Sequence, residues 1–476
     1  MRRLIFFALS MGLALVGAPA PAADSAAKAP ANGVIGIDDE AMLSAPFWIG
    51  RLAYPDATVM DPSAIALENT RLAHEDPSLY DLHEIPASPT RKQVLHWIQG
   101  LSVPPTTPLY DVHGKPISVA TLEALRANLD LGAIAQHPRT RYALVVHRAD
   151  LRTFPTPLRV FDERGDTDID RFQESALFPG TPVLSVHTSR DRRWQFVISP
   201  RYAAWIESQY IAEGSAAQVL GYADRAPYRI ITGATATTVF TPEQLPVSQL
   251  QLDMGVRVPQ LSDWPATRPV NGQHPYTSNV IELPWRNRSG VLEFSPALLQ
   301  KSADSQPGYL PLTRANILRQ AFKFLGERYG WGHSYNARDC SGFVSDVYLS
   351  MGVLMPRNTH AQSVSPGLNH RLFGPTDSRA ARLAAVRALE IGDLVYIPGH
   401  VMMAIGSIDG EPYVIHDTTG LSYRRPDGTL ADVQLNAVSV SPLVPLVFND
   451  TELYIDRMTS IVRIRADNTE QAPLSR

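Results

Sequence analysis

The chain has a single cysteine, Cys340, among its 476 residues. One cysteine cannot form a disulfide within its own chain, so the fold has to be held together by buried apolar cores. A composition of 44% hydrophobic and 19% charged residues can supply such cores. This length predicts roughly two to four domains. The 39 prolines are spread through the chain and favour many short strands and loops, so we expect β-rich modules over much of it.

The charges of the chain are nearly balanced, with 43 Lys and Arg residues, 47 Asp and Glu residues and a net charge of −4. Such a chain has no general attraction for nucleic acid or for an anionic membrane. We therefore expect no nucleic-acid partner. The function has to be inferred from local motifs, and the sequence indicates neither a cofactor nor an oligomeric state.

The N-terminus has the pattern of a secretory signal peptide. Two arginines precede an apolar run at residues 4–16, and Ala-x-Ala motifs that end at Ala20 and Ala22 follow it. The run has about 13 residues and is too short to cross a bilayer of ~30 Å. A cut after Ala20 would leave Pro21 first in the mature chain, so we expect residues 1–22 to be removed. The sequence thus predicts an exported protein with no stable membrane insertion.

The residues that follow Cys340 predict a helix with this cysteine in its first turn. Apolar side chains recur at helical spacing, Asp339 occupies the N-cap position, and Gly352 occupies the position after the helix. A thiol in the first turn lies near unpaired N–H groups and the positive end of the helix dipole, which lower its pKa. A structural thiol would instead fall on the apolar stripe. The pattern favours a nucleophile over an inert buried thiol or an intermolecular disulfide, although the carboxylate of Asp339 opposes the pKa shift.

Two histidines are candidates for the base and its orienting partner. The segment 392–420 reads as strand, loop, strand, turn, strand, with His400 at the start of one strand and His416 at the end of the next. A turn centred on Ile408 places these two histidines directly opposite each other on one face. A two-residue turn at residues 409–410 would bring Asp417 beside His400 instead. Periodicity favours neither register.

Four separated motifs carry a family resemblance: "YGWGHSYNARDCSGF", "MPRNTHAQS", "GDLVYIPGHVMMAIG" and "YVIHD". In this order they resemble the NlpC-type cysteine peptidases that cleave bacterial cell-wall peptides. The resemblance implies a papain-like domain in which Cys340 is the nucleophile, His400 the base and His416 the orienting residue. It also favours the hairpin register centred on Ile408. His333 departs from the family pattern, because a second glycine is common at that position.

The resemblance extends upstream and implies an α+β protein of several domains. The stretch around "WQFVISPRYAAWI" resembles a bacterial SH3-like barrel, a second such barrel is more diverged, and "FWIGRLAYPDATVMDPSAIALENTRLA" resembles the mainly helical N-terminal stabilising domain of multidomain relatives. We expect these domains at residues 34–138 (N-terminal stabilising domain), 140–213 (first barrel), 226–291 (second barrel) and 308–466 (peptidase domain).

The first barrel lines one side of the active-site cleft in related enzymes, which implies substrate-binding residues on both sides of the cleft. We expect Asp339 to bind a free substrate α-amine with Ser341 nearby, and Arg357 to brace the helix. The substrate-binding set is Asp339, Ser341, Tyr329, Trp331, Glu174 and Tyr210, and Tyr202 and Trp205 are further candidates in the barrel.

The resemblance implies hydrolysis of peptidoglycan stem peptides, or muropeptides, between γ-D-glutamate and a diamino acid, in the periplasm. From Asp339 we expect a preference for stems with a free N-terminal L-alanine. Two alternatives remain open, namely a wall-binding protein with a degenerate peptidase domain and an acyltransferase that uses the same Cys/His site. A zinc enzyme is disfavoured, because the sequence has neither HExxH nor paired CxxC spacing.

Overall fold

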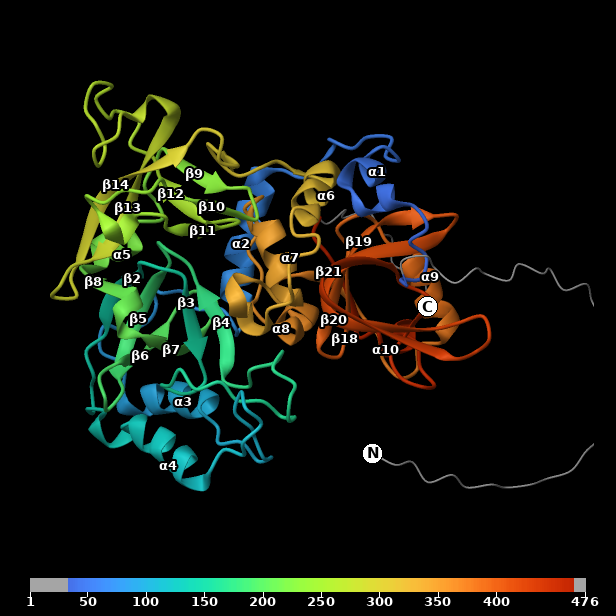
Figure 1. The fold of residues 1–476 in the computed structure, drawn as a ribbon, viewed down its shortest axis with the longest axis horizontal. Helices are drawn as coiled ribbons and strands as arrows, with labels where there is room; N and C mark the ends of the chain where they lie inside the picture. Colours follow the sequence, from blue (N-terminus) through green and yellow to red (C-terminus); the bar gives the residue numbers. More distant parts are fainter. Residues whose placement is uncertain (1–32, 466–476) are drawn as a thin grey trace, which may run out of the picture.

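The computed structural model describes residues 33–465, which combine helices and strands as the predicted α+β class requires. Figure 1 shows two β-rich units on one side of the molecule and the module that carries Cys340 on the other side. Within residues 33–465, no helix is long and apolar enough to cross a bilayer. The expected signal peptide, residues 1–22, lies outside the described residues.

Residues 141–214 form the first β unit, a seven-stranded antiparallel sheet with the strand order β4-β3-β7-β6-β5-β2-β8. Trp205 is fully buried in its core, and its Nε1 donates to the Oγ of Ser102, which directly follows helix α3 (Arg91–Leu101). The expectation that Trp205 lines the cleft is therefore wrong, because the barrel encloses the indole. The strands are β2 (Arg141–Val145), β3 (Ala149–Arg152), β4 (Gln173–Leu177), β5 (Pro182–Thr188), β6 (Trp194–Ile198), β7 (Ala203–Glu207) and β8 (Ile211–Gly214).

The second β unit follows after helix α5 (Ala216–Leu220) and consists of short paired strands and one long hairpin. Residue 291, the expected end of this barrel, lies inside the β13–β14 hairpin, and β15 pairs back onto β9. We therefore place the end of this unit after residue 306. The strands are β9 (Tyr228–Ile231), β10 (Thr235–Thr237), β11 (Gln251–Asp253), β12 (Arg257–Pro259), β13 (Ser278–Arg286), β14 (Leu292–Gln300) and β15 (Ser305–Gln306).

The C-terminal module packs helices α6 (Arg314–Phe322) and α7 (Cys340–Leu349) against a seven-stranded sheet. Phe343 and Val347 of α7 are fully buried against Val401 of β19, so the apolar stripe of the helix faces the sheet as predicted. Helices α8 (Thr359–Val364), α9 (Arg379–Arg387) and α10 (Tyr454–Arg457) complete the module. Its strands are β17 (Asn369–Leu372), β18 (Leu394–Ile397), β19 (His400–Ile408), β20 (Glu411–Arg424), β21 (Leu430–Pro442), β22 (Leu446–Val447) and β23 (Ser460–Arg463).

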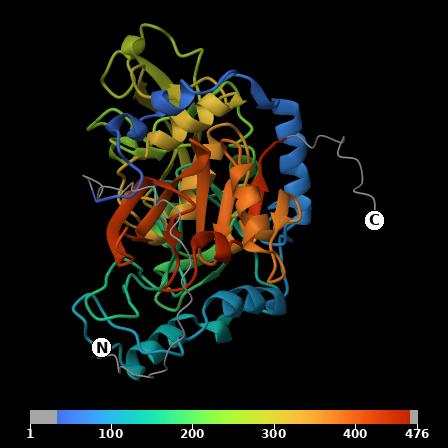
Figure 2. The same cartoon turned by 90° about the vertical axis from the view of Figure 1, so that its right-hand side faces the viewer.

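The N-terminal segment shares its cores with the other units. Trp48, in helix α1 (Ala45–Ile49), and Ile65, in α2 (Pro62–Glu75), belong to the core that contains Cys340. Strand β1 (Thr58–Met60) pairs with β16 (Leu312–Thr313). Helices α3 (Arg91–Leu101) and α4 (Val119–Asn128) cover the core of the first barrel. Figure 2 shows this segment, in blue, running past the C-terminal module, in orange and red.

The burial of Trp48 predicts that the N-terminal segment stabilises the C-terminal module directly. Trp48 is 1% exposed and contacts the ring of Tyr413 on β20. Trp48→Ala should lower the free energy of unfolding by about 3–5 kcal/mol, because it leaves a large cavity. Thermal unfolding followed by circular dichroism measures the effect, with Tyr54→Ala as the control because Tyr54 is 78% exposed. Equal melting temperatures for the two variants would contradict this role.

Candidate active site

Cys340 is the first residue of helix α7. Asp339 is the N-cap, and its Oδ1 accepts the N–H of Gly342 at 2.8 Å. The thiol is 4% exposed, and its sulfur lies 3.8 Å from the hydroxyl of Thr359. It also accepts a hydrogen bond from the backbone N–H of Val401, so β19 begins beside the thiol.

The environment raises the pKa of Cys340 to about 12, opposite to the expected direction. Burial is the main cause, because a thiolate loses solvation in an enclosed site, and the carboxylate of Asp339 adds to the effect. The N–H of Val401 and the hydroxyl of Thr359 act in the other direction. Desolvation outweighs the helix terminus here, so the resting thiol is neutral at pH 7.

His400 and His416 are in contact, as the sequence predicts, but in neither of the registers considered. The hairpin turns at residues 409–410, and the register shifts between Ala404 and Gly406. The register centred on Ile408 is therefore wrong. Ile408 pairs with Glu411, and beyond the bulge Met403 pairs with Ile415. This register places His400 and His416 diagonally on one face, where His400 Nε2 lies 2.8 Å from His416 Nδ1.

A hydroxyl extends this contact into a chain of three side chains. His416 Nε2 lies 3.0 Å from Ser441 Oγ on β21, and both residues are fully buried. Burial lowers the pKa of His416 well below its usual value and that of His400 to about 4, so both rings are neutral at pH 7. If His400 donates through Nε2, His416 donates onward to Ser441. This arrangement leaves His400 Nδ1 free to accept a proton.

Asp417 does not take the orienting position. Neither of its carboxylate oxygens has a hydrogen-bond partner among the described residues. Burial raises its pKa well above the usual value, and the nearby carboxylate of Asp339 adds to this shift. Asp417 lies close enough to Cys340 that a negative charge on it raises the pKa of the thiol.

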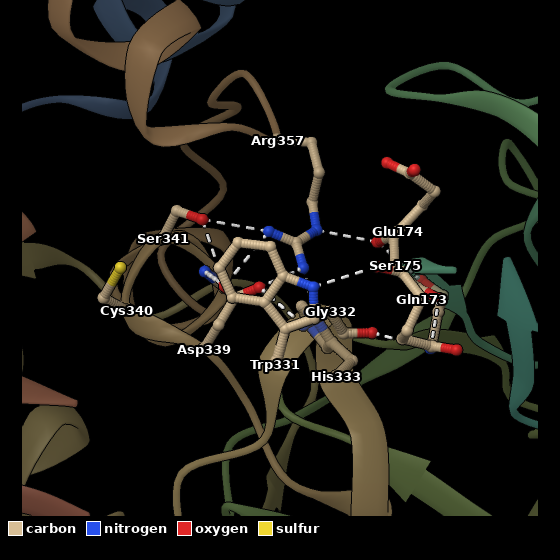
Figure 3. A network of polar contacts seen from close by, with 12 residues as sticks. Gln173, Glu174, Ser175, Trp331, Gly332, His333, Asp339, Cys340, Ser341 and Arg357 are labelled. Carbon is tan, nitrogen blue, oxygen red and sulfur yellow. Dashed lines mark hydrogen bonds and ion pairs between the residues drawn. The ribbon is translucent and has the colours of Figure 1, made fainter. Parts of the chain in front are cut away.

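A buried ion pair surrounds the N-cap carboxylate (Figure 3). Arg357 Nη2 donates to Asp339 Oδ2 at 2.7 Å, and Nη1 donates to Oδ1 at 3.1 Å. The hydroxyl of Ser341 and the N–H of Gly332 donate to the same carboxylate at 3.0 Å each. A substrate ammonium at Asp339 would have to share oxygens that already accept these bonds. Asp339 thus caps the helix and pairs with Arg357, which braces the site.

His333 occupies the position where the family often has glycine, and its backbone adopts the left-handed conformation at φ 65°. Its ring is buried, and its Nδ1 accepts a hydrogen bond from Arg357 Nη2 at 2.7 Å. Burial and the neighbouring arginines lower the pKa of His333 well below its usual value, so it is neutral and can accept this bond. The ring also requires glycine at position 342, where a Cβ would lie 2.3 Å from His333 Cε1.

Strand β4 of the first barrel forms one wall of the site (Figure 3). Ser175 Oγ accepts from Arg357 Nε at 2.7 Å, and the carbonyl of Gln173 accepts from Trp331 Nε1 at 3.0 Å. Glu174 lies between them in sequence and accepts the hydroxyl of Tyr202 at 2.5 Å. The barrel is therefore part of the site, as the resemblance implies.

Two residues of the expected substrate-binding set, Tyr329 and Tyr210, lie in different surroundings. Tyr329 is 7% exposed, and its pKa is raised well above the usual value, mainly by burial. Tyr210 instead lines a different cavity with Tyr335, and Glu174 pairs with Tyr202 rather than with Tyr210.

Sequence reasoning missed Ser441, Thr359 and Ser175. Thr359 lies inside the "MPRNTHAQS" motif and could have been found there. Ser441 and Ser175 lie in strands with no distinguishing pattern, and only tertiary pairing brings them to the site.

Two family models match parts of the chain. Residues 326–439 match the NlpC/P60 family, and residues 159–207 match an SH3 domain of the SH3b1 type. The chain therefore carries an NlpC/P60 domain, which belongs to a family of cysteine peptidases, together with a bacterial-type SH3 domain. The first match contains Cys340, His400 and His416. No curated protein sequence matches the chain significantly.

Solved structures of related fold include an NlpC/P60 endopeptidase from Photobacterium damselae subsp. piscicida. It has a TM-score of 0.70 and 14% identity, and the match covers 88% of this chain and 96% of that one. An NlpC/P60 family protein from Bacillus cereus has a TM-score of 0.45 and 20% identity, over 68% of this chain and 99% of that one. The peptidoglycan hydrolase RipB from Mycobacterium tuberculosis has a TM-score of 0.20 and 20% identity, over 32% and 65%. The first of these supports the multidomain fold.

The histidine chain predicts a role for Ser441 in orienting His416. Ser441→Ala should lower kcat about tenfold with little change in KM, because His416 is then free to adopt the other tautomer. Ser439→Ala is the matched control, since Ser439 pairs with His416 across the strands but donates to the carbonyl of Ala437. Steady-state kinetics measure both variants. Equal losses in the two would show that Ser441 has no special role.

The shifted pKa values predict a broad pH optimum. His400 must be neutral to accept a proton, so kcat/KM should fall only as the pH drops through about 4. On the alkaline side, the thiol ionises only well above pH 9, because burial raises the pKa of Cys340 to about 12. The profile of kcat/KM should be flat between about pH 5 and 9, with circular dichroism confirming the fold at each pH. An acidic limb near 6.5 would contradict a buried His400.

Proposed function

We propose that the chain is a cysteine endopeptidase that hydrolyses peptidoglycan stem peptides between γ-D-glutamate and a diamino acid. The observation that carries the proposal is the series of buried hydrogen bonds from His400 through His416 to Ser441. His400 begins strand β19, and the N–H of the next residue, Val401, donates to the Cys340 sulfur. The NlpC/P60 match over residues 326–439 supports the same assignment.

The chemistry begins with a neutral thiol and a neutral imidazole. His400 accepts the thiol proton as Cys340 attacks the γ-carbonyl carbon, so charge separation arises during the attack rather than before it. The backbone N–H of Cys340, in the first turn of α7, stabilises the oxyanion. His400 then donates the proton to the leaving amine, which yields a γ-glutamyl thioester. Water hydrolyses this thioester with His400 as the base.

We propose Glu174, rather than the expected Asp339, as the site for a substrate ammonium, because the oxygens of Asp339 already accept several hydrogen bonds. The carboxylate of Glu174 accepts hydrogen bonds from Thr153 and Tyr202 on the barrel wall, and no arginine or lysine pairs with it in the described chain. An α-ammonium of N-terminal L-alanine can supply the missing cation. We therefore propose that the substrate is a stem peptide with a free N-terminus, and that the protein acts after export to the periplasm.

Defined muropeptides test this proposal. The enzyme should release the dipeptide L-alanyl-γ-D-glutamate from the free tetrapeptide stem, as identified by mass spectrometry. Cys340→Ala should abolish the release and leave the fold intact, because alanine is well tolerated in a helix. The same stem with an acylated N-terminus should have a kcat/KM lower by about tenfold, which corresponds to ~1.4 kcal/mol. Cleavage at another bond, or unchanged turnover by Cys340→Ala, would reject the assignment.

A further inference from the structure

A second cavity adjoins the active site and is lined by three parts of the chain. It has a volume of about 280 Å³. Arg201 and Tyr202 of the β6–β7 loop line it from the barrel, Trp97 from α3, and Arg357 from the C-terminal module. Arg357 donates to the hydroxyl of Ser341, next to Cys340, at 3.0 Å. The cavity therefore shares a wall with the network around the nucleophile.

Arg201 is the unusual group in this cavity. Its Nε and Nη2 are shielded from solvent and have no hydrogen-bond partner within residues 33–465. These two nitrogens form one edge of the guanidinium, the edge that binds a carboxylate through two parallel hydrogen bonds. A polar group that is buried without a partner is costly, so an unpaired edge of this kind indicates a missing ligand.

The acidic groups near Arg201 are already engaged by other arginines. Asp339 pairs with Arg357, and Asp346 pairs with Arg338, each at 2.7 Å. Burial and the charge of Arg357 lower the pKa of Arg201 to about 10, so it is still cationic at pH 7. The cavity thus presents a positive charge that no carboxylate of the described chain neutralises by contact.

We propose that Arg201 forms a carboxylate-binding subsite for the peptide substrate in this cavity. The proposal rests on the proposed function in that the carboxylate belongs to the stem peptide. A γ-linked glutamate keeps its α-carboxylate free, and the C-terminal residue of the stem carries another. Both offer the same chemistry to the guanidinium. Arg201 lines the cavity, but its unpaired edge is shielded from solvent, so the side chain has to turn for this edge to meet the carboxylate.

The test compares three tetrapeptides: the free acid, its glutamyl α-amide and its C-terminal amide. Arg201→Gln should raise KM for the free acid about tenfold and leave kcat unchanged, because a charge-assisted bond to the substrate is lost. One of the two amides should already have the raised KM with the unmodified enzyme and should show no further rise with Arg201→Gln. That amide identifies the bound carboxylate, and Arg201→Lys should recover part of the affinity. Arg193→Gln is the matched control, because Arg193 is an exposed arginine of the same barrel.

An unchanged KM in Arg201→Gln, or an equal rise on all three peptides, would overturn the subsite. A binding assay separates this result from failure of the proposed function. The tetrapeptide free acid, titrated into the Cys340→Ala variant, should change the fluorescence of Trp97, and adding Arg201→Gln should weaken this binding about tenfold. Trp97→Phe identifies the signal. Binding that depends on Arg201 supports the subsite even if the enzyme cleaves none of the tetrapeptides, and binding unaffected by Arg201→Gln rejects it.

Discussion

The buried ion pair between Arg357 and Asp339 is the interaction on which the site depends. Two charges removed from water are stable only when their remaining hydrogen-bonding groups are also satisfied. Here the carboxylate caps the helix of the nucleophile, and the guanidinium also bonds to Ser175 of the barrel and to the ring of His333. Removing either partner would leave a buried charge unpaired. The pair thus fixes the first turn of α7, the loop before it and the barrel wall in one arrangement.

A second buried arginine joins the β units to the C-terminal module in the same way. Arg338 is fully buried and pairs with Asp346 of helix α7, with Glu327 in the loop after α6, and with Asp253 of the second β unit. Asp253 also pairs with Arg148 of the first barrel. The β units therefore set the geometry of the loop that precedes Cys340. The cavity at Arg201 lies where the first barrel, the N-terminal segment and the C-terminal module meet.

Burial decides the resting state of the catalytic pair. A helix terminus stabilises a thiolate, but desolvation around Cys340 and His400 favours the neutral form of both groups. The thiol proton of Cys340 then moves to His400 during the attack on the substrate. The bound substrate forms part of the surroundings in which the thiolate and imidazolium charges develop. The hydrogen bonds through His416 and Ser441 therefore matter, since they fix which nitrogen of His400 is free to accept the proton.

Local rules, namely helical spacing and capping, were enough for the sequence to place Cys340 in the first turn of a helix. The α+β class and the proximity of His400 and His416 followed instead from the motifs that resemble the NlpC-type peptidases, because periodicity favoured neither hairpin register. The sequence did not determine the hairpin register, because the bulge at Ile405 lies where β19 packs against α7 and against Trp48 of α1. Likewise, Arg357 as the partner of Asp339, Ser441 as the partner of His416 and the unpaired edge of Arg201 depend on contacts between segments distant in sequence. Only tertiary packing decides such contacts, because no local pattern records which side chain lies across a strand or a domain boundary.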